Sequence, residues 1–275
     1  MKPFLKWAGG KYRVLPEILK LLPSGHTLIE PFVGSGAVFL NTDFKKYILA
    51  DSNKDLINLY NCLKNGGKEF INECEAIFIP ANNQEKVFYE LREEFNNLSD
   101  SNKDKERKSI LFIYLNRHCF NGLCRYNKSF KFNVPYGKYK SPYFPREEMI
   151  NFQEQSKKAK FIHQDFRQTM NITNTKKGDI FYCDPPYVPV SKTASFTSYA
   201  QGGFGLEEQE DLVECALQLK KKKISVLISN SDTQWVREHY IEDEYCSIKS
   251  FNVRRFISAD SAKRKDAGEI LALFK

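Results

Sequence analysis

Seven short apolar segments alternate with longer segments of helical periodicity along most of this 275-residue chain. The strand candidates are residues 27–32, 47–50, 160–163, 179–183, 224–229, 245–253 and 269–274. The helix candidates are residues 11–22, 56–64, 85–95, 105–115, 146–157 and 207–221. Several strand candidates are apolar on both faces, which is typical of strands buried in a parallel sheet. The alternation predicts a doubly wound α/β fold on a seven-stranded sheet.

The alternation is interrupted once, in the middle of the chain. Residues 56–144 show mostly helical signals, followed by a polar and aromatic segment that contains glycine. The strand–helix rhythm resumes near Ala159. We therefore predict a smaller, mainly helical domain of residues 56–144, inserted into a sheet domain formed by residues 1–55 and 145–275.

The charge and cysteine content narrow the class of protein. Lys and Arg number 42 against 34 Asp and Glu, a formal net charge of +8, which favours a polyanionic partner but also fits a generally basic protein. The seven cysteines form no CxxC pair and the four histidines are scattered, so we expect a reducing cytoplasm and no metal site. Neither a signal peptide nor an apolar run of about 18 residues is present, which argues against a membrane protein.

A glycine turn follows the first strand candidate. Gly34 and Gly36 come directly after residues 27–32, an arrangement that lets the backbone approach a nucleotide-like ligand. The third glycine of the dinucleotide fingerprint is missing, so a nucleoside with a small charged tail fits better than NAD. Asp51 ends the next strand candidate and could accept both ribose hydroxyls, although a helix N-cap is an alternative that is compatible with this role. Asp165 and Phe166 follow another strand and could reach the same ligand.

The segment Asp184-Pro185-Pro186-Tyr187 follows the strand candidate 179–183. Ligands of open α/β sheets bind at this end of the strands. The two prolines stiffen the loop and remove two N–H donors while leaving carbonyl acceptors. We predict that Asp184 and the Pro185 carbonyl accept hydrogen bonds from a planar amino group while Tyr187 stacks on its ring. A rigid turn around a buried aromatic side chain is the alternative.

The segment from Arg117 to Lys140 combines positive charge with aromatic rings. It holds six Lys or Arg, no Asp or Glu, and six Phe or Tyr. Basic side chains neutralise phosphates, and aromatic rings stack on bases or wedge between them. We predict a nucleic-acid surface here; a solvated basic face is the alternative. Residues 191–204, rich in Ser, Thr and Gly, are either a lid over the ligand or an irregular loop.

Several motifs together resemble a known family. FVGSG at 32–36 and DPPY at 184–187, in this order with an insert between them, resemble the α group of DNA amino-methyltransferases. Further segments are similar to the Dam-type DNA adenine-N6 methyltransferases, which act on GATC: LKWAGGK at 5–11, YILAD at 47–51, REEFN at 92–96, YLNR at 114–117, NGLCRYN at 121–127 and ISN at 228–230. The resemblance covers nearly the whole chain.

The resemblance implies S-adenosylmethionine as cofactor and double-stranded DNA as partner, with no metal, no membrane and no obligate protein partner. It implies a methyltransferase sheet domain and a recognition domain that carries a β-hairpin. The implied cofactor contacts are Trp7, Lys11, Phe32, Gly34, Gly36, Asp51, Asp165, Phe166 and Asp184, with Phe32 and Phe166 flanking the adenine. The implied catalytic residues are Asp184, Pro185 and Tyr187.

The resemblance also implies a set of DNA contacts. Arg125 is the candidate guanine reader. Phe120 would fill the gap left by a flipped adenine, although relatives usually carry Tyr there. The other candidate DNA contacts are Lys6, Arg117, Asn121, Leu123, Asn127, Asn133, Pro135 and Lys138.

Three other functions compete with this interpretation. A methyltransferase for cytosine N4 or for RNA adenine shares the chemistry, but cytosine enzymes often carry Ser in place of the Asp of DPPY. A DNA-binding regulator without activity is disfavoured by the intact DPPY and FVGSG segments. A nicotinamide-dependent oxidoreductase would not explain the basic aromatic insert.

Overall fold

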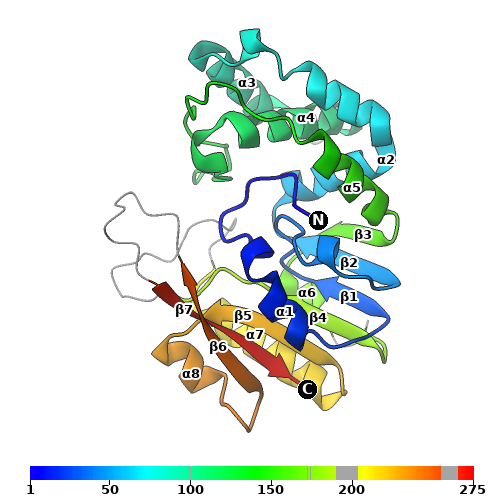
Figure 1. Ribbon diagram of the computed structural model, residues 1–275, viewed down its shortest axis with the longest axis vertical. Coiled ribbons are helices and arrows are strands. Elements are labelled where there is room, and N and C mark those ends of the chain that lie inside the picture. The colour runs from blue at the N-terminus through cyan, green and yellow to red at the C-terminus, as the bar shows by residue number, and fades with distance from the viewer. Residues whose placement is uncertain (100, 172, 174, 190–203, 255–265) are drawn as a thin grey trace. The chain divides into compact units, whose positions relative to one another are not determined.

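The computed structural model of the chain describes residues 1–99, 101–171, 173, 175–189, 204–254 and 266–275 (Figure 1). Of the lid candidate, residues 191–203 lie outside the described residues. No helix in the described ranges is both long and apolar enough to cross a membrane.

A mixed sheet of seven strands forms the centre of the fold. Its strands are β1 (Thr27–Glu30), β2 (Lys46–Asp51), β3 (Ala159–His163), β4 (Asp179–Cys183), β5 (Ser225–Ser231), β6 (Ser247–Arg254) and β7 (Asp266–Phe274). The order across the sheet is β3-β2-β1-β4-β5-β7-β6. Strand β1 pairs in parallel with β2 and β4, β4 pairs in parallel with β5, and β7 is antiparallel to β5 and β6. The predicted seven-stranded α/β fold is confirmed.

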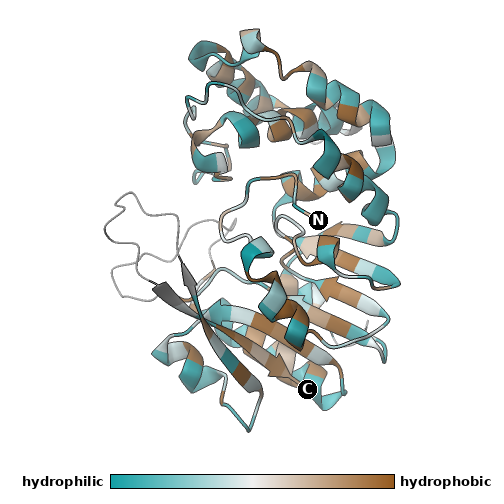
Figure 2. Cartoon of the chain, viewed as in Figure 1, coloured by the Kyte–Doolittle hydropathy of each residue, from teal (hydrophilic) through white to brown (hydrophobic). Residues whose placement is uncertain are grey.

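The central strands are buried along their whole length. Every residue of β1, β4 and β5 is buried, and each strand contains a hydrophobic stretch, brown in Figure 2. Burial on both faces is what a parallel sheet covered by helices requires. Helix α1 (Leu15–Leu21) packs against β7, and α7 (Leu206–Lys221) packs against β5 and β7. These helices supply part of the cover that the buried strands require.

Contacts divide the described chain into two compact units. Unit 1 comprises Met1–Arg13, Val33–Asp43 and Asp51–His163, and unit 2 comprises Val14–Phe32, Phe44–Ala50 and Gln164–Lys275. Unit 1 thus contains the whole predicted insert, 56–144, together with the N-terminal segment and the glycine loop. The proposed division into 1–55 with 145–275 and 56–144 stays a prediction.

Unit 1 is mainly helical. Its helices are α2 (Lys54–Ala76), α3 (Glu85–Asn97), α4 (Asn102–His118) and α5 (Arg146–Ser156). Asn53 caps α2 by accepting the N–H of Leu56 at 3.0 Å. Helix α2 extends beyond the predicted end at residue 64. Gly67 interrupts it with a positive φ of 54°, which glycine adopts without strain, and the helix continues after this single break.

A short helical turn follows the glycine loop. Only a 3₁₀ turn, η2 (Phe39–Asn41), forms there. Asn41 Nδ2 donates to the carbonyl of Ala37 at 2.8 Å, and Thr42 Oγ1 donates to that of Val38 at 3.0 Å. These side chains take the acceptors that the next helical N–H groups would use, so the helix ends.

Aromatic side chains fill the core of unit 1 beside the glycine loop. Phe152 contacts Phe4 at 5.0 Å, Tyr60 at 4.6 Å and Phe161 at 5.7 Å between ring centroids. Such ring pairs add to the free energy gained from burial. The N-terminal segment that carries Trp7 is thereby anchored through Phe4.

Candidate active site and nucleic-acid interface

The Asp-Pro-Pro-Tyr loop leaves β4 at its C-terminal end, and three polar side chains fix it. Gln209 of α7 donates to the carbonyl of Pro186 at 2.7 Å. Asn230 Oδ1 accepts the N–H of Val188 at 3.2 Å, and Ser231 Oγ donates to the carbonyl of Val188 at 2.6 Å. Gln209, Asn230 and Ser231 are fully buried. A loop stiffened by proline and held on both sides offers a preorganised site for a planar ligand.

Asp184 itself is half-buried, and Pro185 is buried. The Tyr187 hydroxyl donates to Glu269 of β7 at 3.1 Å. Burial, with Asp184 and Glu269 nearby, raises the pKa of Tyr187 well above its ordinary value, so the hydroxyl stays protonated. The structure thus brings together the three predicted catalytic residues on one loop and adds Glu269 as the group that orients the Tyr187 ring.

The glycine loop in unit 1 is closely packed. Gly34 has a left-handed backbone (φ 47°), and a Cβ there would lie 2.9 Å from Trp7 Nε1. Its N–H donates to Asp51 Oδ2 at 3.0 Å, and its carbonyl accepts the Tyr60 hydroxyl at 2.5 Å. The predicted residues Trp7, Gly34 and Asp51 therefore meet at one place, and only glycine fits between them.

Asp51 stands at the end of β2 with two N–H donors on its carboxylate. Oδ1 accepts the N–H of Asn53 at 2.9 Å, and Oδ2 accepts that of Gly34. Burial raises its pKa above the ordinary value, and these N–H groups and His163 oppose the rise. The helix N-cap that the sequence offered as an alternative falls to Asn53. Asp51 is thus oriented by two backbone N–H groups and is only partly exposed.

The other predicted cofactor residues of unit 1 are also ordered. Lys11 is buried and donates from Nζ to the carbonyl of Gly9 at 2.6 Å. Gly36 has φ 71°, and a Cβ there would lie 3.3 Å from Phe152. Both therefore shape the backbone around the loop.

The two predicted adenine-flanking rings lie in unit 2 and touch each other. Phe32 and Phe166 stack with their centroids 5.3 Å apart at 28°. A ring sandwiched between them would need about 7 Å, twice the van der Waals contact distance. Phe204 meets Phe32 and Phe166 at 5.6 Å. The rings thus form a cluster on which an adenine can pack, rather than a slot of fixed width.

Asp165 lies at the start of the short helix α6 (Phe166–Thr169). Its Oδ1 accepts the N–H of Arg167 at 2.8 Å, and Oδ2 lies 3.3 Å from Nη1 of the same arginine. Arg167 also donates to Asp211 at 2.6 Å. The structure therefore shows Asp165 as an exposed cap beside the aromatic cluster.

The aromatic residues of the basic segment divide into two groups. Phe132 is buried, Tyr126 donates to Asp55 at 2.7 Å, and Tyr136 donates to Asn83. Tyr139 lies under the ammonium group of Lys6, 4.1 Å from ring centroid to Nζ. Only Phe120 and Phe130 of these six are exposed, at 51% and 62%. Four of the six rings therefore make contacts within unit 1, and the other two are accessible to a partner.

The predicted β-hairpin is a tight turn rather than a regular ladder. An isolated antiparallel bridge joins Tyr126 and Phe132. Asn127 closes the turn, because its Oδ1 accepts the N–H of Ser129 at 2.9 Å and of Lys131 at 3.0 Å. Arg125 Nε donates to Asn133 Oδ1 at 2.9 Å across the turn. The predicted DNA contacts Arg125, Asn127 and Asn133 thus come together in one preorganised element.

The N-terminal segment lies against the start of this element. Asn116 of α4 accepts the N–H of Lys6 at 2.9 Å and donates to the carbonyls of Lys6 and Gly122. Asn121 has a left-handed backbone (φ 54°), and its N–H donates to the Tyr139 hydroxyl at 3.0 Å. Burial and the charge of Arg117 lower the pKa of Lys6. Asn116 therefore fixes Lys6 relative to the basic segment from Arg117 to Lys140 (the recognition segment).

Arg117 differs from the other predicted DNA contacts. It is buried, donates from Nε to the carbonyl of Tyr143 at 2.9 Å, and reaches the carbonyl of Phe4 at 3.4 Å. Its guanidinium lies over the Tyr143 ring at 5.1 Å. In contrast, Pro135 and Lys138 are exposed and Leu123 is partly exposed. Arg117 supports the segment from inside unit 1.

Sequence reasoning missed several residues that fix the site. Gln209, Asn230 and Glu269 were given no role, and neither were Arg92 and Asn96 of α3. Arg92 donates to the carbonyl of Val134, and Asn96 pairs with the backbone of Phe132 through both of its side-chain atoms. A usable signal existed for Gln209, which is a polar residue on the apolar face of a predicted helix.

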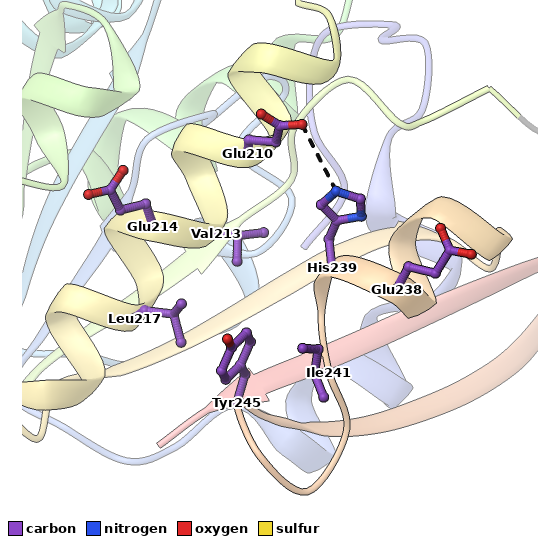
Figure 3. Close-up of a pocket in the computed structure, with 8 residues that line it drawn as sticks. All are labelled: Glu210, Val213, Glu214, Leu217, Glu238, His239, Ile241 and Tyr245. Carbon is purple, nitrogen blue, oxygen red and sulfur yellow. Dashed lines mark ion pairs between the residues drawn. The ribbon is translucent and has the colours of Figure 1, made fainter.

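One pocket of unit 2 contains none of the predicted site residues. It encloses about 330 Å³ between α7 and α8 (Gln234–His239), as Figure 3 shows. Its floor is apolar, and Glu210, Glu214 and Glu238 line its rim. His239 Nε2 lies 3.9 Å from Glu210 Oε1. Three carboxylates would repel phosphates, so this pocket is no part of a nucleic-acid interface.

The cysteines and possible metal ligands suggest no further chemistry. Burial raises the pKa of every one of the seven cysteine thiols, to about 12 for Cys119 and Cys246. Cys183, next to Asp184, is fully buried in the core of unit 2. Among the described residues, no group of three His, Cys, Asp or Glu could hold a metal ion.

Comparison with known proteins identifies the family. A family model described as D12 class N6 adenine-specific DNA methyltransferase matches residues 7–255. DNA adenine methylases of Salmonella typhi and Escherichia coli (strain K12) are each 47% identical over 274 residues, covering 100% of this chain and 95% of theirs. That of Serratia marcescens is 46% identical over 275 residues, covering 100% of this chain and 98% of its own.

A solved structure described as a putative RNA methyltransferase from Pyrococcus horikoshii aligns with 11% identity and a TM-score of 0.41, covering 100% of this chain and 92% of its own. This likeness is too weak to bear on function. The full-length match to the sequence family is decisive: the chain belongs to the D12 class of N6 adenine-specific DNA methyltransferases.

Proposed function

We propose that this adenine-specific DNA methyltransferase uses S-adenosylmethionine to methylate N6 of an adenine that is flipped out of double-stranded DNA, with GATC as its site. The observation that carries the proposal is the Asp184–Tyr187 loop, a carboxylate and proline carbonyls held at the end of β4 by Gln209, Asn230 and Ser231. A base cannot react inside the stack, so the target must leave the duplex to reach such a loop.

The residues present fit S-adenosylmethionine. Gly34 follows the carboxyl end of β1, Asp51 is the last residue of β2, and Asp184 follows β4, the neighbour of β1 in the sheet. Trp7 packs where only a glycine fits, which brings backbone close to the ligand. We assign the ribose hydroxyls to Asp51 and the adenine to the Phe32, Phe166 and Phe204 cluster. Lys11, Gly36 and Asp165 shape the surroundings of this cofactor.

The chemistry needs positioning more than acid–base groups. The N6 lone pair of adenine is delocalised into the ring, which makes the amine a poor nucleophile. The Asp184 carboxylate and the Pro185 carbonyl accept its two N–H bonds and favour a tetrahedral nitrogen whose lone pair is available. S-adenosylmethionine supplies the electrophilic sulfonium methyl. Tyr187, oriented by Glu269, stacks on the flipped ring.

Recognition is assigned to the exposed part of unit 1. Arg125, oriented by Asn133, reads guanine through two hydrogen bonds. Phe120 occupies the gap left by the adenine, and Phe130 at the turn stacks on a base or sugar. The surrounding DNA contacts are Lys6, Asn121, Leu123, Asn127, Pro135 and Lys138. Arg117 contributes from below by holding this segment. We assign the enzyme to the cytoplasm, where its DNA substrate is.

Transfer of labelled methyl from S-adenosylmethionine to DNA duplexes that differ at one base pair, followed by nucleoside analysis, tests the proposal. N6-methyladenine should form on the GATC duplex and not on duplexes with one substituted pair. Label in cytosine, or equal labelling of every duplex, would contradict it.

A further inference from the structure

The N-terminus of α2 touches both proposed sites of unit 1. Asn53 gives its backbone N–H to Asp51, the proposed ribose acceptor, at 2.9 Å. Its side-chain oxygen caps α2 at Leu56, and its amide nitrogen donates to Cys124 Sγ at 3.5 Å. One residue, Asn53, therefore connects the cofactor carboxylate through its backbone, and the helix start and the recognition segment through its side chain.

A second contact joins α2 and the recognition segment, two residues further along each of them. The Tyr126 hydroxyl donates to Asp55 Oδ2 at 2.7 Å. Asp55 is buried, and its other oxygen forms an ion pair with Lys108 at 3.1 Å. A hydrogen bond to a buried carboxylate is stronger and more directional than one between neutral groups. This second bond therefore fixes the distance between the recognition segment and α2.

Cys124 and Tyr126 stand on either side of Arg125, the proposed guanine reader. In an extended segment, alternate side chains point to opposite sides. Here the two neighbours face α2, while Arg125 reaches Asn133 across the turn. A change in the position of Arg125 on a base pair must therefore act on the two bonds to α2.

We infer that Asn53 and Tyr126 are positioning residues that couple S-adenosylmethionine binding to recognition of the DNA site. The cofactor holds the element Asp51 to Asp55 through Asp51, and DNA holds it through Cys124 and Tyr126, so the ligand that binds second meets an element already held by the first. The coupling must be reciprocal: specific DNA tightens cofactor binding by the factor by which cofactor tightens DNA binding. The inference rests on the proposed roles of Asp51 and Arg125.

The test titrates S-adenosylhomocysteine into the whole enzyme by calorimetry, with and without a saturating GATC duplex. For the unaltered enzyme we expect the duplex to lower the Kd at least about fivefold, within the range usual for coupled sites. Tyr126→Phe keeps the ring and removes only the hydroxyl. It should reduce the coupling factor at least about threefold while the Kd without DNA stays within about twofold.

Tyr136→Phe is the matched control. It removes a tyrosine hydroxyl bond of the same unit, to Asn83, that has no contact with α2 among those described. Its coupling factor should equal that of the unaltered enzyme. Cys124→Ala removes the acceptor of Asn53 and should act like Tyr126→Phe, whereas Cys62→Ala, which removes an acceptor of Ser109 within unit 1, should not.

The inference is overturned if the duplex leaves the Kd of the unaltered enzyme unchanged, if Tyr126→Phe retains full coupling, or if Tyr136→Phe loses as much. The variant Asp51→Ala distinguishes failure of the proposed cofactor site from failure of the proposed coupling. If Asp51→Ala binds S-adenosylhomocysteine normally, the proposed cofactor site is wrong. If that variant loses binding while Tyr126→Phe keeps full coupling, only the coupling is wrong.

Discussion

Gln209 donates a hydrogen bond of 2.7 Å to the carbonyl of Pro186, from a position on α7 that solvent does not reach. Its side-chain oxygen accepts Asn230 Nδ2 at 3.0 Å, so the helix and β5 hold the loop through one amide. The direction of the Pro186 carbonyl is therefore set by a residue outside the loop.

Gln209→Met should lower kcat about 10- to 100-fold with little change in KM for DNA. Methionine fills the space but leaves the Pro186 carbonyl and one N–H of the Asn230 amide without their partner, which costs about 1–3 kcal/mol of stability and misplaces the acceptors. Steady-state kinetics with urea unfolding measures both effects. Gln218→Met, at an exposed site on the same helix, should change neither; equal damage there would contradict a specific role.

Asp184→Asn should reduce methyl transfer at least about a thousandfold, because the amide replaces a charged acceptor with a weaker one in a preorganised site. DNA binding, measured by fluorescence anisotropy, should persist. Asp211→Asn removes a carboxylate that pairs with Arg167 in the same unit and should retain activity. Full activity of Asp184→Asn would refute the proposed mechanism.

Arg125→Ala should relax sequence choice at one position of the site, by about 1–3 kcal/mol. Competition between GATC and singly substituted duplexes measures this loss. Lys128→Ala, an exposed neighbour, should instead weaken binding to all duplexes alike and make it less dependent on salt. An unchanged preference in Arg125→Ala would remove it as the guanine reader.

Phe130→Gly should stabilise the protein and weaken DNA binding at once. Phe130 is 62% exposed with φ 56°, a backbone that costs a bulky residue about 1–2 kcal/mol and glycine almost nothing. Loss of one stacking ring should raise the Kd for DNA about tenfold. Asp243→Gly relieves a similar backbone (φ 63°) in unit 2 and should leave DNA binding unchanged. Tight DNA binding by Phe130→Gly would exclude the contact.

Acid should destabilise unit 1 through His118. Burial, with Lys6 and Arg117 nearby, lowers the pKa of His118 to about 4 from an ordinary 6.5. The unfolded chain then binds more protons between these values, so stability falls as the pH drops from about 6.5 towards 4, by about 2 kcal/mol at pH 5. Urea unfolding at pH 7 and pH 5 should show this loss in the unaltered protein and a smaller one in His118→Phe. Identical pH dependence in both would contradict it.

The sequence predicted the sheet and the position of its loops because periodicity and burial are local signals. All seven strand candidates overlap the observed strands. As expected, Gly34 and Asp184 follow strands and Asp51 ends one. The packing partners were out of reach. Glu269 and Asn230 meet the loop at Tyr187 and Val188 only after β5 and β7 pair, which no spacing along the chain reveals. Composition likewise could not show that Tyr126 points inward and Phe130 outward.

The burial of the thiols has a practical consequence. A sulfur reacts with alkylating reagents and peroxide as the thiolate, and the raised pKa values leave almost none of that form at neutral pH. Iodoacetamide at pH 7 should therefore label the native enzyme slowly and leave it active, whereas the urea-unfolded chain should take up seven equivalents. The rate of labelling then becomes a gauge of how often each unit opens.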